Sequence, residues 1–250
     1  MSGHSHWAGI KQRKGVNDAK KANVFTKYGR LVSIAAKQGG GNPDHNFSLR
    51  LAIDQARSVN MPKDTIEKAI KKGTGETGDV HYEEVMYEGY APGGVAIMVE
   101  ALTDNRHRTG PEMRRMFEKH GGTLGTSGCV NWMFSKKGLI TVKTGDVNEE
   151  DLLEIAMAGG ADDMRNTGAV FEITCQPGVY EQLKKTLEEK KIPTQMAEVS
   201  MVPHNTVPVN DEATAKKILS LMEDFFEHDD VQEAYANFDI PDEMISKIAG

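Results

Sequence analysis

The sequence lacks the features that mark metal sites, disulfide-rich proteins, membrane proteins and the common hydrolases. Its two cysteines, Cys129 and Cys175, have no CxxC partner and no nearby histidine cluster, so neither a zinc site nor a disulfide framework is indicated. No apolar stretch approaches the ~20 residues of a membrane span, and the N-terminus lacks the apolar segment of a signal peptide. GxSxG and HExxH motifs are also absent. We therefore expect a cytoplasmic, non-enzymatic protein without a metal, cofactor, small-molecule substrate or membrane partner.

Charge is divided unevenly along the 250 residues. Residues 1–75, the basic head, carry 14 Lys and Arg against 5 Asp and Glu, a net charge of +9. Residues 76–250, the acidic body, carry 16 against 32, a net charge of −16. A basic end on an acidic chain is typical of proteins that bind a polyanion with one end, so nucleic acid is the expected partner. Within the body, the acidic run at 227–230 is interpreted as exposed surface.

Residues 1–16, the arm, show no helical or strand period. The arm combines imidazole, aromatic and cationic side chains: His6, Trp7, Lys11, Arg13 and Lys14. Cations pair with phosphates, and an indole that stacks on an unpaired base contributes ~1–3 kcal/mol in known single-strand binders. The arm is therefore predicted to contact nucleic acid. The alternative is a solvated, disordered tail, which is common at chain termini.

A helix is predicted over residues 17–37, because apolar residues recur there on one face. Beside that face, four cations fall within an arc of roughly 100° on a helical wheel. No Asp or Glu lies between Asp18 and Asp44, so these cations have no local partner. We predict phosphate contacts for the cations of this helix, with plain solvated surface as the alternative. The four within the arc are Lys20, Lys27, Arg30 and Lys37, and Lys21 is a fifth predicted contact on the same helix.

Two further helices complete a predicted three-helix head, one beginning near His45 and one at Pro62. A helix-turn-helix is conceivable, but Asp64 and Glu67 would occupy the early turns of its recognition helix, where phosphates lie. The GxGxxG match at residues 73–78 follows a helix and precedes a β-rich segment, which is the wrong context for a dinucleotide site. It is interpreted as a linker.

The acidic body is predicted to hold two α+β modules. The first begins with a hairpin of strands at 85–90 and 95–102, a helix at 109–120 with Pro111 in its first turn, and a strand at 129–134. Residues 138–202 then follow the order βαββαβ, which is typical of a ferredoxin-like fold. A helix at 214–226 and a strand at 231–238 have no partner of their own and are expected to complete the first sheet.

The predicted fold class is therefore α+β, with the ferredoxin-like module inserted into the other module. The expected domains are 1–75, the discontinuous pair 80–135 and 206–250, and 136–205.

Several long motifs closely resemble the YebC/PmpR family. They are GHSHWAGIKQRKG, FTKYGRLVSIAAKQGGGNP, NMPKDTIEKAIKKGTGE, YEGYAPGGVAIMVEALTDNRHRT, GGTLGTSGCVNWMF and DVQEAYANFDIPDE, in the family's order and over nearly the whole chain. The resemblance implies a three-domain architecture and no enzymatic activity. Its functional implication is divided: bacterial members are described as DNA-binding transcriptional regulators, and mitochondrial relatives as activators of translation. Some bacterial members are assigned to the ribosome, where they assist synthesis through proline-rich stretches.

The residues favour RNA over DNA within that division. A basic arm carrying Trp7 suits irregular or single-stranded targets, and neither a dimer-forming heptad nor a clean recognition helix is present. We therefore expect an RNA- or ribosome-associated translation factor. DNA binding at promoters and docking of an acidic protein partner are the alternatives.

Overall fold

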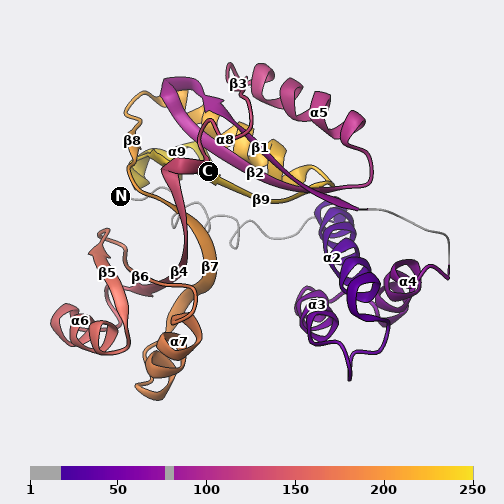
Figure 1. Cartoon of the computed structure of the whole chain (residues 1–250). Coiled ribbons are helices and arrows are strands. Elements are labelled where there is room, and N and C mark those ends of the chain that lie inside the picture. Colours follow the sequence, from indigo (N-terminus) through magenta and orange to yellow (C-terminus); the bar gives the residue numbers. More distant parts are fainter. Residues whose placement is uncertain (1–17, 77–81, 250) are drawn as a thin grey trace.

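The computed structural model describes residues 18–76 and 82–249. Figure 1 shows three parts: a sheet with long helices at the top, the helical head below it at one end, and a second sheet with its own helices below it at the other. The head therefore lies against one end of the acidic body, away from the second sheet. No helix in the described ranges is long and apolar enough to cross a membrane.

Within residues 18–76 the head is a three-helix unit, as predicted. Its helices are α2 (Asp18–Gly39), α3 (Phe47–Ser58) and α4 (Lys63–Gly73). The expected apolar faces form its core, which includes the buried residues Val32, Ala35, Ala36, Leu49, Ala52, Ile53 and Ala56. Asn46 joins the first two helices, because its Oδ1 accepts from Leu49 N at 3.1 Å and its Nδ2 donates to Ala35 O at 2.7 Å.

Glycine 73, the first residue of the GxGxxG match, has a packing role. A Cβ at this position would lie 2.1 Å from Ser33 O, so only glycine allows α4 to approach α2 this closely. Ser33 Oγ donates to Ala69 O at 2.8 Å across the same contact. Residues 77 and 78 of the match lie outside the described residues.

The central sheet has the strand order β3-β1-β2-β9, with every neighbouring pair antiparallel. Its strands are β1 (Glu83–Ala91), β2 (Val95–Thr103), β3 (Thr123–Leu124) and β9 (Val231–Ala236), and Pro92–Gly94 (η1) joins the first two. Strand β9 thus pairs with β2 across more than 100 positions of sequence, and the prediction that the C-terminal segment completes the first sheet is confirmed.

Strand β2 is buried on both faces because two sets of residues alternate along it. Ile97 and Val99 pack against α5 (Arg106–Lys119) and α8 (Glu212–Glu227). Ala96 and Met98 face the opposite way, toward Phe134 and other residues of a second cluster. The central sheet therefore contacts helices on one face and the start of the inserted module on the other.

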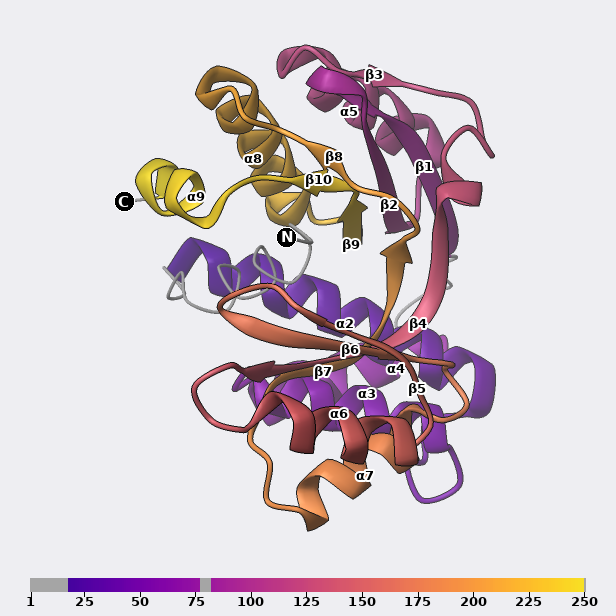
Figure 2. The same ribbon diagram turned by 90° about the vertical axis from the view of Figure 1, so that its left-hand side faces the viewer.

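The inserted module is ferredoxin-like, which confirms the α+β class and the insertion. Its elements run β4 (Phe134–Lys143), α6 (Glu149–Ala158), β5 (Ala161–Asn166), β6 (Val170–Cys175), α7 (Tyr180–Glu189) and β7 (Thr194–Pro203). The antiparallel sheet has the order β5-β6-β4-β7. Figure 2 shows β4 and β7 running together from the central sheet into this module, as a two-stranded connection.

Three details of the body differ from the sequence predictions. The strand expected at 129–134 is wrong, because β4 begins at Phe134 and Asn131–Met133 is a short 3-10 helix, η2. Helix α5 begins at Arg106 rather than 109, since Asn105 caps it by accepting from Arg108 N, and Pro111 therefore lies inside the helix. Residues 207–249 also form more elements than predicted: β8 (Val207–Pro208) and α9 (Asp242–Ala249) are additional, and the strand predicted at 231–238 is divided into β9 and β10 (Phe238–Asp239).

Candidate nucleic-acid interface

The structure describes only part of the predicted nucleic-acid site. His6, Trp7, Lys11, Arg13 and Lys14 lie outside the described residues. Lys20 and Lys21 lie on α2, but their side chains are outside the description. The remaining three predicted residues, Lys27, Arg30 and Lys37, are described along the same helix.

Lys27 and Arg30 contact the acidic body. Lys27 Nζ donates to Phe226 O at 2.6 Å, at the C-terminal turn of α8. Carbonyls there lack partners within the helix and carry the negative end of its dipole, so a lysine stabilises them. Arg30 Nη1 lies 2.6 Å from Asp230 Oδ1, and its side chain is only 12% exposed. Both cations thus have partners some 200 positions away, although the sequence offered them none nearby.

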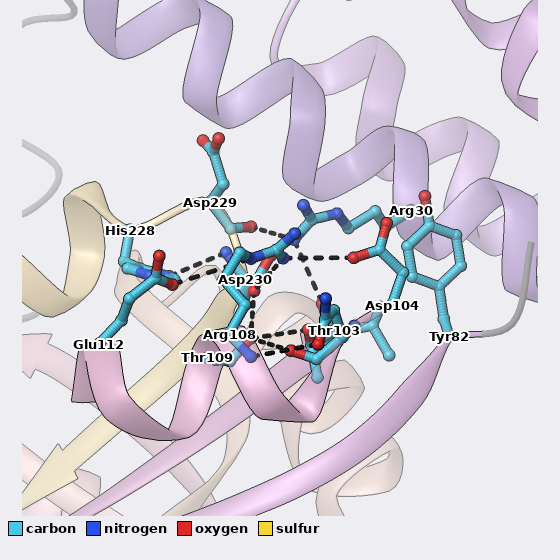
Figure 3. A network of polar contacts seen from close by, with 12 residues as sticks. Arg30, Tyr82, Thr103, Asp104, Arg108, Thr109, Glu112, His228, Asp229 and Asp230 are labelled. Atoms are coloured by element: carbon cyan, nitrogen blue, oxygen red, sulfur yellow. Dashed lines mark hydrogen bonds and ion pairs between the residues drawn. The ribbon is translucent and has the colours of Figure 1, made fainter. Parts of the chain in front are cut away.

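Asp230 is the centre of this contact (Figure 3). Its side chain is 1% exposed, so the interpretation of residues 227–230 as exposed surface is wrong at this position. Arg108 Nη2 and Thr109 Oγ1 each donate to Asp230 Oδ2 at 2.6 Å, while Arg30 pairs with the other oxygen. Burial alone would raise the pKa of this carboxyl, but the hydrogen bonds from Thr109 and Arg108 and the charges of both arginines lower it to about 2. The carboxylate is therefore ionised and fully partnered.

His228 adds a second contact beside Asp230. Its Nδ1 accepts from Asp230 N at 3.1 Å, so the proton of a neutral ring is on Nε2, which lies 3.1 Å from Glu112 Oε2. Glu112, His228 and Asp230 are close enough to hold a metal ion. They do not fit one, because both oxygens of Asp230 already accept strong bonds and two guanidinium groups lie where the cation's charge would be repelled.

The outward surface of the head carries other cations. Exposed Lys and Arg side chains on α2, α3 and α4 are Lys37, Arg50, Arg57, Lys63, Lys68 and Lys71. Arg57 and Lys63 have weak partners on their own helices, at 3.5 and 3.6 Å from Asp54 and Glu67. Lys37, at the end of α2, remains an exposed candidate from the predicted set.

An exposed aromatic residue lies beside one of these cations, Arg50. Phe47, the first residue of α3, is 73% exposed, and the guanidinium carbon of Arg50 lies 5.9 Å from its ring centroid. Leu51, one turn further along, is 51% exposed. The first turn of α3 contains no acidic residue. A flat ring with a cation beside it suits a nucleobase that is followed by a phosphate.

Sequence reasoning missed Phe47, Arg108 and Asp230. The position of Phe47 one residue after the capping Asn46 was a usable signal, since its side chain falls outside the apolar face formed by Leu49, Ala52 and Ile53. Arg108 and Asp230 gave no such signal. They meet only because β9 pairs with β2, which brings the residue before β9 to the start of α5.

Comparisons with known proteins cover almost the whole chain. Models described as the TACO1/YebC protein N-terminal domain and the TACO1/YebC second and third domain match residues 5–76 and 82–238. A probable transcriptional regulatory protein of Dictyoglomus turgidum is 52% identical over 250 residues, 100% of both chains. One from Halothermothrix orenii is 47% identical over 99% of each chain. The crystal structure of a conserved hypothetical protein of Aquifex aeolicus matches with a TM-score of 0.77 and 48% identity, over 95% of this chain and 98% of that one.

Proposed function

Because this chain belongs to the TACO1/YebC family, we propose that it is a regulator of gene expression that binds nucleic acid through its basic head, with RNA as the target. The names of the relatives describe regulators rather than enzymes, and they support the broader part of this proposal. The choice of RNA, and of a role at the ribosome, depends on the residues of the head.

The exposed ring of Phe47 beside Arg50 is the observation that carries the proposal. Burial of an exposed aromatic ring against an unpaired base is favourable, whereas the stacked bases of a duplex present only their edges. Helix α4 gives the complementary argument, because Asp64 lies in its first turn, where a recognition helix would meet phosphates. The head is therefore better suited to single-stranded or irregular RNA than to the groove of duplex DNA.

In the proposed complex, the cations around Phe47 hold the phosphates. Arg50 lies beside its ring on α3, and Lys37 is an exposed cation near the end of α2. The arm residues His6, Trp7, Lys11, Arg13 and Lys14, together with Lys20 and Lys21, extend the contact along the strand. Lys27 and Arg30 join them only if the head leaves the acidic body, because their side chains contact Phe226 and Asp230.

DNA binding at promoters is the second candidate function. The relatives' names favour it, since they are called transcriptional regulatory proteins. It requires a defined duplex sequence that is bound ~10³-fold or more tightly than competitor DNA. A surface that stacks unpaired bases does not supply such discrimination.

The two functions are separated by binding of the full chain to ribosomes, structured RNA and duplex DNA across a salt series. We expect RNA or ribosomes to be preferred. Phe47→Ala should weaken RNA binding roughly tenfold, because stacking contributes ~1–3 kcal/mol per base, and should leave duplex DNA binding unchanged. Lys37→Glu with Arg50→Glu should weaken both and lower the salt slope by about 1.5, as expected for two lost phosphate contacts.

A matched control is Arg165→Glu with Lys190→Glu, which makes the same charge change on exposed residues of the inserted module. This variant should bind RNA like the unmodified chain. A preference for one duplex DNA sequence that survives competitor, with no effect of Phe47→Ala, would replace the RNA proposal with the promoter function.

A further inference from the structure

A groove of about 630 Å³ lies on the acidic body, between α5 and β1. Residues of α5 line one side and residues 85–88 of β1 line the other, and Leu124, Gly125 and Ser127 also contribute to the lining. Figure 1 shows α5 lying over β1 with β3 beside the C-terminal end of the helix. Three arginines of α5 line this arginine groove: Arg106, Arg114 and Arg115.

These arginines make the groove cationic within an acidic body. Arg114 and Arg115 are exposed and have no ion pair or hydrogen-bond partner among the described residues. Arg106 Nη1 lies 3.6 Å from Glu83 Oε2, and both side chains are about 60% exposed. An ion pair that is this exposed contributes little to stability. Helix α5 as a whole carries five Lys and Arg against two Glu. Of those two, Glu118 lines the groove and Glu112 contacts His228.

The middle of the groove is open because α5 has a glycine there. Arg106, Gly110 and Arg114 follow one another at intervals of four residues and so lie along one side of the helix. An added Cβ on Gly110 would meet nothing closer than Tyr87, at 3.9 Å. The arginines at the two ends are eight residues apart, a rise of about 12 Å along the helix. That spacing is several times the ~3.4 Å axial rise per phosphate along one strand of a duplex, so a chain of phosphates fits the groove better than a lone anion.

Glu88, which also lines the groove, holds the adjoining loop in place. Its carboxylate, 4% exposed, accepts from the backbone N–H groups of Gly128, Val130 and Asn131 at 2.6, 2.8 and 2.8 Å. These bonds fix the loop that follows residue 127 and engage both carboxylate oxygens. The groove is thus formed before any ligand arrives, which lowers the entropic cost of binding.

We propose that the arginine groove binds the phosphodiester backbone of the same RNA strand that the head holds. Guanidinium groups form two parallel hydrogen bonds to a phosphate, so Arg106, Arg114 and Arg115 supply a track for successive phosphates. The track begins next to the head, because Arg108 on the adjacent side of α5 shares Asp230 with Arg30. This inference rests on the proposed function and adds a second contact surface to it.

The test uses the full chain with Arg114→Glu and Arg115→Glu together, and a fluorescent oligouridine as the probe. We expect affinity to fall at least tenfold and the slope of log K against log salt to fall by about 1.5, as two lost phosphates on a single strand require. Amide exchange in residues 106–119 should slow when oligouridine binds the unmodified chain, and not when it binds the variant. Arg165→Glu with Lys190→Glu again serves as the control of equal charge.

Each outcome separates the two proposals. If Lys37→Glu with Arg50→Glu loses RNA while the α5 variant binds with the original slope, the groove proposal is overturned and the proposed function stands. If the unmodified chain binds neither oligouridine nor structured RNA, the proposed function and the groove proposal are both overturned. If the α5 variant loses binding to polyglutamate but retains RNA, the groove takes an acidic protein and the proposal is also overturned.

Discussion

Asp230 shows how one carboxylate, at the scale of a residue, joins two parts of the chain. It is buried just before β9. It accepts hydrogen bonds from Arg108 and Thr109 and forms an ion pair with Arg30. A buried ion pair often gives little net stability, because desolvation costs about as much as the pair returns. Removing one partner is different, because it leaves the other charges buried and unpaired. Asp230 is therefore a sensitive position even if the network as a whole adds little.

Asp230→Asn should destabilise the protein by about 3–5 kcal/mol at neutral pH, since Arg30 and Arg108 lose their counter-charge. The pKa of Asp230 is lowered to about 2 from an ordinary 3.8, so the ionised form stabilises the fold. That contribution, about 2 kcal/mol, is complete above pH ~4 and is lost as the pH falls toward 2. The difference between wild type and variant should therefore shrink in acid, as measured by urea unfolding at neutral pH and near pH 3.

Asp163→Asn is the matched control, because Asp163 pairs with Arg165 while half exposed. It should change stability by less than ~1 kcal/mol at either pH. A deficit of Asp230→Asn that is equally large in acid would show that the carboxylate charge is not its source.

At the scale of elements, the sequence predicted those helices and strands that depend on a local pattern of residues. The three helices of the head followed from apolar spacing, and the βαββαβ order followed from alternating strand and helix signals. The strand prediction at 129–134 is wrong because backbone N–H groups of this segment donate to Glu88, some 40 residues upstream, instead of to a neighbouring strand. The same limit applies to the site: exposed Lys37 is a local feature, whereas the partners of Lys27 and Arg30 come from distant strands and helices.

Helix packing in the head depends on Gly73, the last residue of α4. Gly73→Ala places a Cβ 2.1 Å from Ser33 O and 2.9 Å from the Cβ of Ala36, so the helices must separate. We expect a loss of about 1–3 kcal/mol, as for other overpacked sites, although alanine favours helices more than glycine does. Amide exchange in α2 and α4 should report this loss.

Gly145→Ala provides the comparison, because no heavy atom lies within 4 Å of the added Cβ. Its stability should stay within ~0.5 kcal/mol of the wild type. Equal exchange rates in the Gly73 and Gly145 variants would mean that the contact between α2 and α4 tolerates a methyl group.

At the scale of the whole molecule, the head is held to the body by opposite charge. The chain separates +9 on the head from −16 on the body, and the two meet where Lys27 contacts the end of α8 and Arg30 contacts Asp230, just before β9. Figure 3 shows the Arg30 contact. Two of the cations that the sequence assigned to phosphate are thus placed where the body supplies carbonyl and carboxylate oxygens. The body fixes the orientation of the head relative to the arginine groove.

Arg30→Ala should release the head without unfolding it. The variant loses the pair with Asp230 and the hydrogen bonds to Asp229 O and Leu102 O, at 2.6 and 3.2 Å. A loss of about 3 kcal/mol shifts the balance of attached and detached heads by roughly a hundredfold. Small-angle scattering should then give a larger radius of gyration, with an unchanged circular dichroism spectrum. Arg50→Ala removes an exposed arginine of α3 that has no hydrogen bond or ion pair to the body within the described residues, and it should leave the radius of gyration as it was. An unchanged radius in both variants would mean that the head is held by contacts other than the Arg30 pair.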